Sequence, residues 1–118
     1  MTTTVSPATR DIVLRSLLGH RLYLACHGGP PGGSGAHEYS AAPYQRQPVS
    51  FVQRGEGMAN TSEVRFIMPD AAVRWLGLWD AQNGGRFIMA ADTQQRTLAL
   101  GDTYVVPAGA VRIAVRTD

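Results

Sequence analysis

The sequence has 118 residues, of which 44% are hydrophobic, and its formal net charge is +2. This length and apolar content are typical of one folded domain, residues 1–118, and argue against a disordered chain. A single cysteine excludes an internal disulfide, and no apolar run approaches the roughly 20 residues of a membrane span. The first residues lack the charged start and apolar stretch of a secretory signal, so we expect synthesis in the cytoplasm and no membrane insertion.

The positive charges do not indicate a nucleic-acid partner. All eleven basic residues are arginine, and they are spread singly from Arg10 to Arg116 with carboxylates between them. Domains that bind nucleic acid usually gather their basic residues on one face or along one helix. We therefore expect no nucleic acid among the partners of this chain.

Residues 6–19 have the periodicity of a helix. Ser6 can cap this helix, Pro7 suits its first turn, and Gly19 suits its end. Valine and leucine side chains recur four residues apart, which places them on one face. The sequence therefore predicts a short N-terminal α-helix with an apolar face that packs against another layer.

The rest of the chain has the alternation and the turn residues of short β-strands. Residues 62–68 alternate apolar and polar side chains, as a strand with one solvated face does. Residues 73–79 are apolar on both faces apart from one arginine, so we expect a central strand that is covered on both sides. We expect the other strands at residues 21–26, 48–53, 86–90, 97–100, 103–106 and 110–116. About eight short strands joined by turns predict a mainly β fold, a β-sandwich or jelly roll with the short helix at its N-terminus.

Two turns stand out between these strands. Residues 80–85 read DAQNGG, and the Asn-Gly pair that begins at Asn83 is typical of a hairpin connection. Gly101 and Asp102 mark a second turn. We expect Asp80 and Asp102 to hold their turns through hydrogen bonds to the backbone.

The two tryptophans lie four residues apart within one expected strand. Trp75 and Trp79 therefore share a face, where they can stack on a sugar or pack in the core. Large aromatic rings are more often buried than exposed as a platform. We expect both to be core residues.

Several side chains that can bind metals surround a loop of glycine and proline. They are His20, Cys26, His27, His37 and Glu38. Cys26 and His27 are adjacent, so they leave a strand on opposite faces, and the spacing is not that of a zinc site. The glycines do not form a phosphate-binding loop, because that motif needs a lysine and a following helix. No nucleophile motif is present either, so we expect no metal, no cofactor, no catalytic residue and no enzymatic activity.

Several phrases of the sequence, in this order and spacing, resemble a family of small phage tail fibre or minor tail proteins. The family opens with a leucine-rich helix, continues through a strand and a glycine-proline loop, and carries characteristic phrases near its end. The matching phrases here are LYLACH (22–27), GGPPGG (28–33), EYS (38–40), PYQRQPVSF (43–51), GLWDAQNGG (77–85), GDT (101–103) and PAGAVRI (107–113). The resemblance implies a β-rich virion component without catalytic residues.

From this resemblance we expect a structural component of a tailed-phage virion, a tail-tip, tail-fibre or minor tail protein. Its expected partners are other virion proteins and further copies of itself, since symmetric neighbours commonly cover apolar surface. Residues 27–43 are expected to be an exposed loop that contacts a partner or a receptor, including a host-surface glycan. The contact residues expected there are His27, Pro30, Pro31, His37, Glu38 and Tyr39. One alternative is a capsid decoration protein, and a second is a carbohydrate-binding module with its tryptophans, or Tyr39 and Tyr44, exposed.

Overall fold

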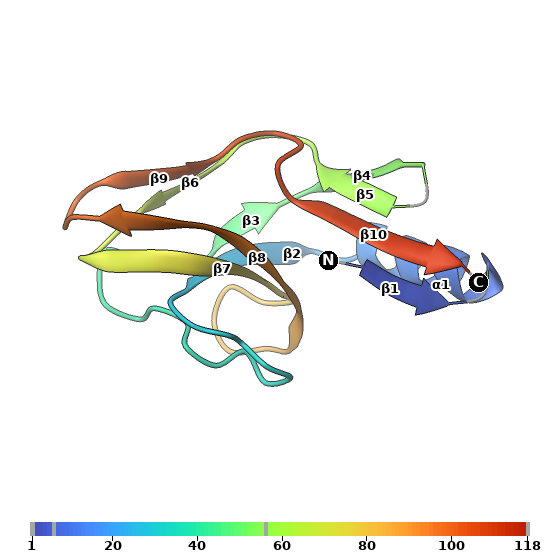
Figure 1. Ribbon diagram of the computed structural model, residues 1–118, viewed down its shortest axis with the longest axis horizontal. Coiled ribbons are helices and arrows are strands. Elements are labelled where there is room, and N and C mark those ends of the chain that lie inside the picture. Colours follow the sequence, from blue (N-terminus) through green and yellow to red (C-terminus); the bar gives the residue numbers. More distant parts are fainter. Residues whose placement is uncertain (1, 6, 56, 118) are drawn as a thin grey trace.

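The computed structural model describes residues 2–5, 7–55 and 57–117. These residues form ten strands and one helix (Figure 1). The elements are β1 (Thr2–Val5), α1 (Pro7–Leu18), β2 (Leu22–His27), β3 (Gln47–Val49), β4 (Phe51–Arg54), β5 (Gly57–Asn60), β6 (Val64–Ile67), β7 (Ala71–Trp79), β8 (Phe87–Leu98), β9 (Thr103–Val106) and β10 (Arg112–Thr117). The prediction of a mainly β chain with one short N-terminal helix is confirmed. Among the described residues, no helix has the length and apolarity needed to cross a membrane.

The strands belong to three sheets. One sheet has the order β1-β10-β5-β4, a second has the order β3-β2-β7-β8, and β6 pairs with β9 in a third. The β1–β10 pair is parallel, and the other pairs are antiparallel. The molecule is elongated, 45 × 26 × 24 Å, with α1 and the β1–β10 pair at one end and the β8–β9 turn at the other (Figure 1).

The core lies where the helix and the faces of the sheets meet. On β6 the predicted alternation is confirmed, since Val64 and Phe66 are buried while the residues between and after them are exposed. Phe66 is fully buried and packs between the rings of Tyr44 and Tyr104, with centroids 6.1 and 6.3 Å away. β7 lies between β2 and β8, which confirms that residues 73–79 form a central strand.

The helix spans Pro7–Leu18, close to the predicted 6–19. Leu14 and Leu17 are buried in the core, whereas Leu18 is 37% exposed. The backbone N–H of Gly19 donates to the carbonyl of Arg15, 3.0 Å away, as expected at a helix end. The predicted cap, Ser6, lies outside the described residues.

The strands differ from the predicted ones in number, in length and in the sheets that they join. The expected strand 48–53 divides at Ser50, where the chain passes from the second sheet (β3) into the first (β4). The expected strands 86–90 and 97–100 are joined as one twelve-residue strand, β8. β1 and β5 are not among the predicted strands, and the residues of β5, GMAN, lack alternation. Gly57 begins this strand because any larger residue would run into the carbonyl of Ile113 on β10.

Candidate functional site

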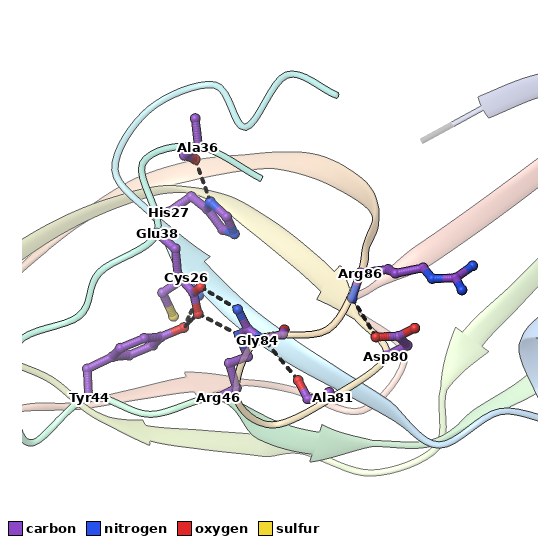
Figure 2. A network of polar contacts seen from close by, with 10 residues as sticks. All are labelled: Cys26, His27, Ala36, Glu38, Tyr44, Arg46, Asp80, Ala81, Gly84 and Arg86. Atoms are coloured by element: carbon purple, nitrogen blue, oxygen red, sulfur yellow. Dashed lines mark hydrogen bonds and ion pairs between the residues drawn. The ribbon is translucent and has the colours of Figure 1, made fainter. Parts of the chain in front are cut away.

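Two loops meet over one face of the β2–β7 pair. The first, residues 28–46, follows β2 and returns to its end through an antiparallel bridge between His27 and Glu38. Before it reaches this bridge, the loop passes over Trp79, with Gly35 against the ring. The second loop, residues 80–86, joins β7 to β8. The side chains that hold these loops together are drawn in Figure 2, apart from Trp79.

Arg46 is the centre of this arrangement and is only 7% exposed. Its Nε and Nη2 atoms donate to the two carboxylate oxygens of Glu38, at 2.9 and 2.8 Å. Its Nη1 atom donates to the carbonyls of Ala81 and Gly84 in the second loop, at 2.8 and 2.7 Å (Figure 2). The guanidinium carbon lies 3.8 Å from the ring centroid of Trp79. One arginine therefore ties both loops to each other and to the sheet, through a bidentate ion pair and a cation–π contact.

Tyr44 completes what we call the clasp: Glu38, Tyr44, Arg46 and Trp79. The Tyr44 hydroxyl donates to Glu38, 2.7 Å away, and accepts the backbone N–H of Cys26 at 3.0 Å. Burial would raise the pKa of Glu38, but the hydrogen bonds from Arg46 and Tyr44 outweigh it and lower that pKa. Burial, followed by the bond to Glu38, raises the pKa of Tyr44. The clasp therefore holds a carboxylate, a guanidinium and a neutral phenol at neutral pH.

His27 lies beneath the first loop and is fully buried. Its Nδ1 atom is 2.8 Å from the carbonyl of Ala36 and donates to it when the ring is neutral. Its ring stacks on Trp79, with the centroids 6.4 Å apart, and lies 6.1 Å from the Phe87 ring. Nε2 is buried, finds no hydrogen-bond partner among the described residues, and occupies space left free by Gly77.

This environment disfavours a charged imidazole. Burial is the main cause that lowers the pKa of His27 below its ordinary value of about 6.5, since protonation would place an N–H at Nε2 without an acceptor. The nearby carboxylate of Glu38 and the hydrogen bond to Ala36 oppose this shift, while Arg46 and His37 add to it.

We expect the free energy of unfolding to fall as the pH is lowered through about 6.5, the ordinary pKa of histidine. Because the folded pKa of His27 is lowered, the unfolded chain binds more protons between that pKa and about 6.5, and stability is lost across this window. Glu38 acts at lower pH, since its stabilisation is lost only below about 4.3. Urea unfolding at a series of pH values measures the effect.

The exposed His20 provides the control for this experiment. His27→Phe should remove most of the pH dependence, whereas His20→Gln should keep it, because His20 is exposed and is not among the groups that shift the pKa of His27. An unchanged pH profile in His27→Phe would contradict the assignment to His27.

The expected contact loop is only partly accessible. Pro30 and His37 are exposed, and Glu38 and Tyr39 are half-buried. His27 and Pro31 are buried, which corrects the expectation that they belong to an exposed contact surface. The physical reason is that the loop folds back over the sheet and covers the last residue of β2.

The two tryptophans differ in burial. Trp79 is 9% exposed and lies under the guanidinium of Arg46, whereas Trp75 is half-buried. The β7–β8 ladder has irregularities next to both residues, between Val73 and Trp75 and between Leu78 and Trp79. Because Trp79 is buried and Trp75 is half-buried, neither ring is fully exposed for a sugar to stack on.

The expected turn residues lie at the ends of paired strands. Asp80 Oδ1 accepts the backbone N–H of Arg86 at 2.6 Å and so closes the 80–86 loop (Figure 2). Asn83 is exposed within that loop. Asp102 Oδ2 accepts the backbone N–H of Ala99 at 2.8 Å and so holds the second turn. Gly101, in the same turn, has a φ of 91°, a backbone conformation that favours glycine.

Two buried polar residues were missed from the sequence, Arg46 and Asn60. The Asn60 amide donates to the carbonyls of Ser62 and Pro107, at 2.9 and 3.0 Å, and its oxygen accepts the N–H of Val111 at 2.9 Å. It therefore fixes the turn that leads into β10. Nothing in the local sequence distinguishes either residue from its exposed counterparts.

Among the described residues, no group of three or more histidine, cysteine, aspartate or glutamate side chains is placed to hold a metal ion. Burial raises the pKa of the Cys26 thiol, and Glu38 raises it further, so this thiol is protonated and unreactive at neutral pH. The hydrogen bonds of the clasp hold the two loops against the sheet and leave the outer surface of the loops facing solvent.

Comparison with known protein families identifies the family of the chain. The family model described as podophage GP4 fiber I protein gp80 matches residues 3–114. The chain belongs to this family of phage tail fibre proteins. The membership confirms the resemblance found in the sequence, and the match covers the helix, the clasp and β2 to β9 of the fibre protein in full. No curated protein matches the chain.

Proposed function

We propose that this fibre protein is a structural module of the tail of a tailed phage, at the tail tip or in a fibre, and that its clasped loops contact a partner or the host surface. The observation that carries the proposal is Arg46, which links residues 28–46 and 80–86 although it lies 35 and 38 residues from its partners in the second loop. Loops held rigidly on a sheet are well suited to recognition, because little conformational entropy is lost on binding.

We infer that the module is made in the host cytoplasm and is assembled into the virion with further copies and with other virion proteins. Large apolar side chains are exposed far apart in the sequence: Ile12 and Leu100 are each 68% exposed, and Ile67 is 56% exposed. Helix α1 and the β8–β9 turn lie at opposite ends of the long axis (Figure 1). Exposed apolar side chains at both ends support assembly into a multimer, because contact with neighbours removes them from water.

Localisation in the virion tests this proposal. Density or label should appear at the tail, at the tip or along a fibre, when purified particles are imaged with a tagged copy of the protein. A signal over the capsid shell would instead identify a decoration protein and overturn the proposed position.

A further inference from the structure

The side chain of Asn83 takes no part in the contacts that hold the 80–86 loop. Arg46 bonds to the carbonyls of Ala81 and Gly84, one on each side of Asn83 (Figure 2). Among the described residues, neither the side-chain amide of Asn83 nor the backbone N–H of Gly84 makes a hydrogen bond. An amide carbonyl and a backbone nitrogen that are adjacent in the chain are therefore free to approach each other.

The peptide bond between these two residues is open to solvent. Asn83 and Gly84 are both exposed, and no atom of the described residues lies within 4 Å of the position that a Cβ on Gly84 would occupy. Because glycine has no side chain, nothing shields the backbone nitrogen from the preceding residue. The approach of the two groups needs only rotation within Asn83, and a reaction between neighbouring groups of one chain is strongly favoured over the same reaction between separate molecules.

We propose that Asn83 is a site of spontaneous deamidation, in which its side chain cyclises with the backbone nitrogen of Gly84. This nitrogen loses its proton and attacks Cγ of Asn83, so that a C–N bond forms, the Cγ–Nδ2 bond breaks, and the NH2 group takes up a proton and leaves as ammonia. Water then opens the cyclic succinimide at either of its carbonyls. The products are aspartate, with the ordinary main chain, and isoaspartate, in which the main chain passes through Cβ and Cγ.

The other asparagine of the chain, Asn60, is protected from the same reaction. It is buried, and its amide nitrogen donates to the carbonyls of Ser62 and Pro107, at 2.9 and 3.0 Å. The next residue is Thr61, whose backbone N–H donates to the carbonyl of Ser50 at 2.9 Å. Both groups that would react are engaged in hydrogen bonds, so Asn60 should stay intact.

Deamidation changes the loop that Arg46 holds. Isoaspartate adds one atom to the main chain immediately before Gly84, whose carbonyl accepts a hydrogen bond from Nη1 of Arg46 at 2.7 Å. Both products add a carboxylate at residue 83, which lines a hollow of about 210 Å³ together with Glu38. Isoaspartate therefore displaces a partner of Arg46, whereas aspartate changes only the charge.

Peptide mapping of aged protein tests the proposal. The full-length protein and a synthetic peptide of residues 75–86 are incubated in parallel in mildly alkaline buffer, and the protein is then digested with trypsin. Cleavage after arginine places Asn83 in the fragment 75–86 and Asn60 in the fragment 55–65, so mass spectrometry follows each asparagine by itself. An unaged sample corrects for conversion during the digestion.

The peptide provides the time scale for the reaction. We expect Asn83 of the protein to become aspartate and isoaspartate at a rate within about tenfold of that in the peptide, while Asn60 is unchanged. A rate more than about tenfold below that of the peptide, or equal conversion of Asn60 and Asn83, would overturn the proposal.

Two variants separate the chemistry from its effect on the clasp. Asn83→Gln keeps an exposed amide but requires a larger ring, so its conversion should be at least about tenfold slower. The isoaspartate form, purified from aged protein by chromatography, should show faster hydrogen exchange at residues 80–86 than Asn83→Asp, which adds the charge without the extra main-chain atom. Equal conversion in Asn83→Gln would contradict the cyclisation, and equal exchange in the two charged forms would contradict the displacement of Gly84 from Arg46.

Discussion

Arg46→Ala is expected to lower the free energy of unfolding by about 3–5 kcal/mol. The substitution leaves the largely buried carboxylate of Glu38 with Tyr44 as its remaining side-chain donor, and it removes the donor from two loop carbonyls. Removing one partner of a buried pair costs more than the pair contributes, because the other charge stays desolvated. Urea unfolding followed by circular dichroism measures the change.

An exposed pair on β6 provides the matched control. The side chains of Arg65 and Glu63 are 65% and 45% exposed, so Arg65→Ala should cost at most about 1 kcal/mol. Arg46→Lys keeps the charge but lacks the planar fork that bonds Glu38 and both carbonyls, so it should be intermediate. A loss in Arg46→Ala no greater than that in Arg65→Ala would show that the clasp does not stabilise the fold.

Hydrogen exchange shows where the stability is lost. In Arg46→Lys, backbone amides of residues 28–46 and 80–86 should exchange faster, while those of β5 and β10 keep their protection. This pattern follows because Arg46 joins the two loops and makes no contact with the first sheet in the hydrogen bonds described.

The sequence contains enough information to predict the β class, because alternation is a local property. Val64 and Phe66 lie two residues apart on β6, so they share its buried face regardless of which strand pairs with β6. The central position of residues 73–79 in their sheet follows from their apolar side chains on both faces. The helix could be located for the same reason. Partner strands and sheet membership depend on distant residues, so the crossing at Ser50 between two sheets was not predictable from local pattern.

The clasp could not be predicted for a related reason. All eleven basic residues are arginine, and Arg46 has polar neighbours like many of the others. Its burial depends on carbonyls 35 and 38 residues away and on the ring of Trp79. His27 was placed in an exposed loop because it precedes glycines and prolines, and only the return of that loop over the sheet buries it.

Trp79→Ala is expected to cost about 3–5 kcal/mol, because the ring is almost fully buried and supports both Arg46 and His27. Trp75→Ala removes the same side chain from a half-buried position on the same strand and should cost clearly less. Thermal and urea unfolding of the two variants give the comparison. Equal losses would show that the burial of Trp79 under Arg46 adds nothing to its contribution to stability.

Trp79→Phe keeps the protein folded while it tests the link between Trp79 and His27. The smaller ring opens space beside the imidazole and admits water, so the pKa of His27 should rise toward its ordinary value of about 6.5. NMR titration of the histidine ring signals measures this pKa, and the same change in Trp75→Phe should have a smaller effect because Trp79 is the tryptophan on which the His27 ring stacks. If the pKa of His27 stayed equally low in Trp79→Phe, its desolvation would come from the loop above it rather than from the ring that supports it.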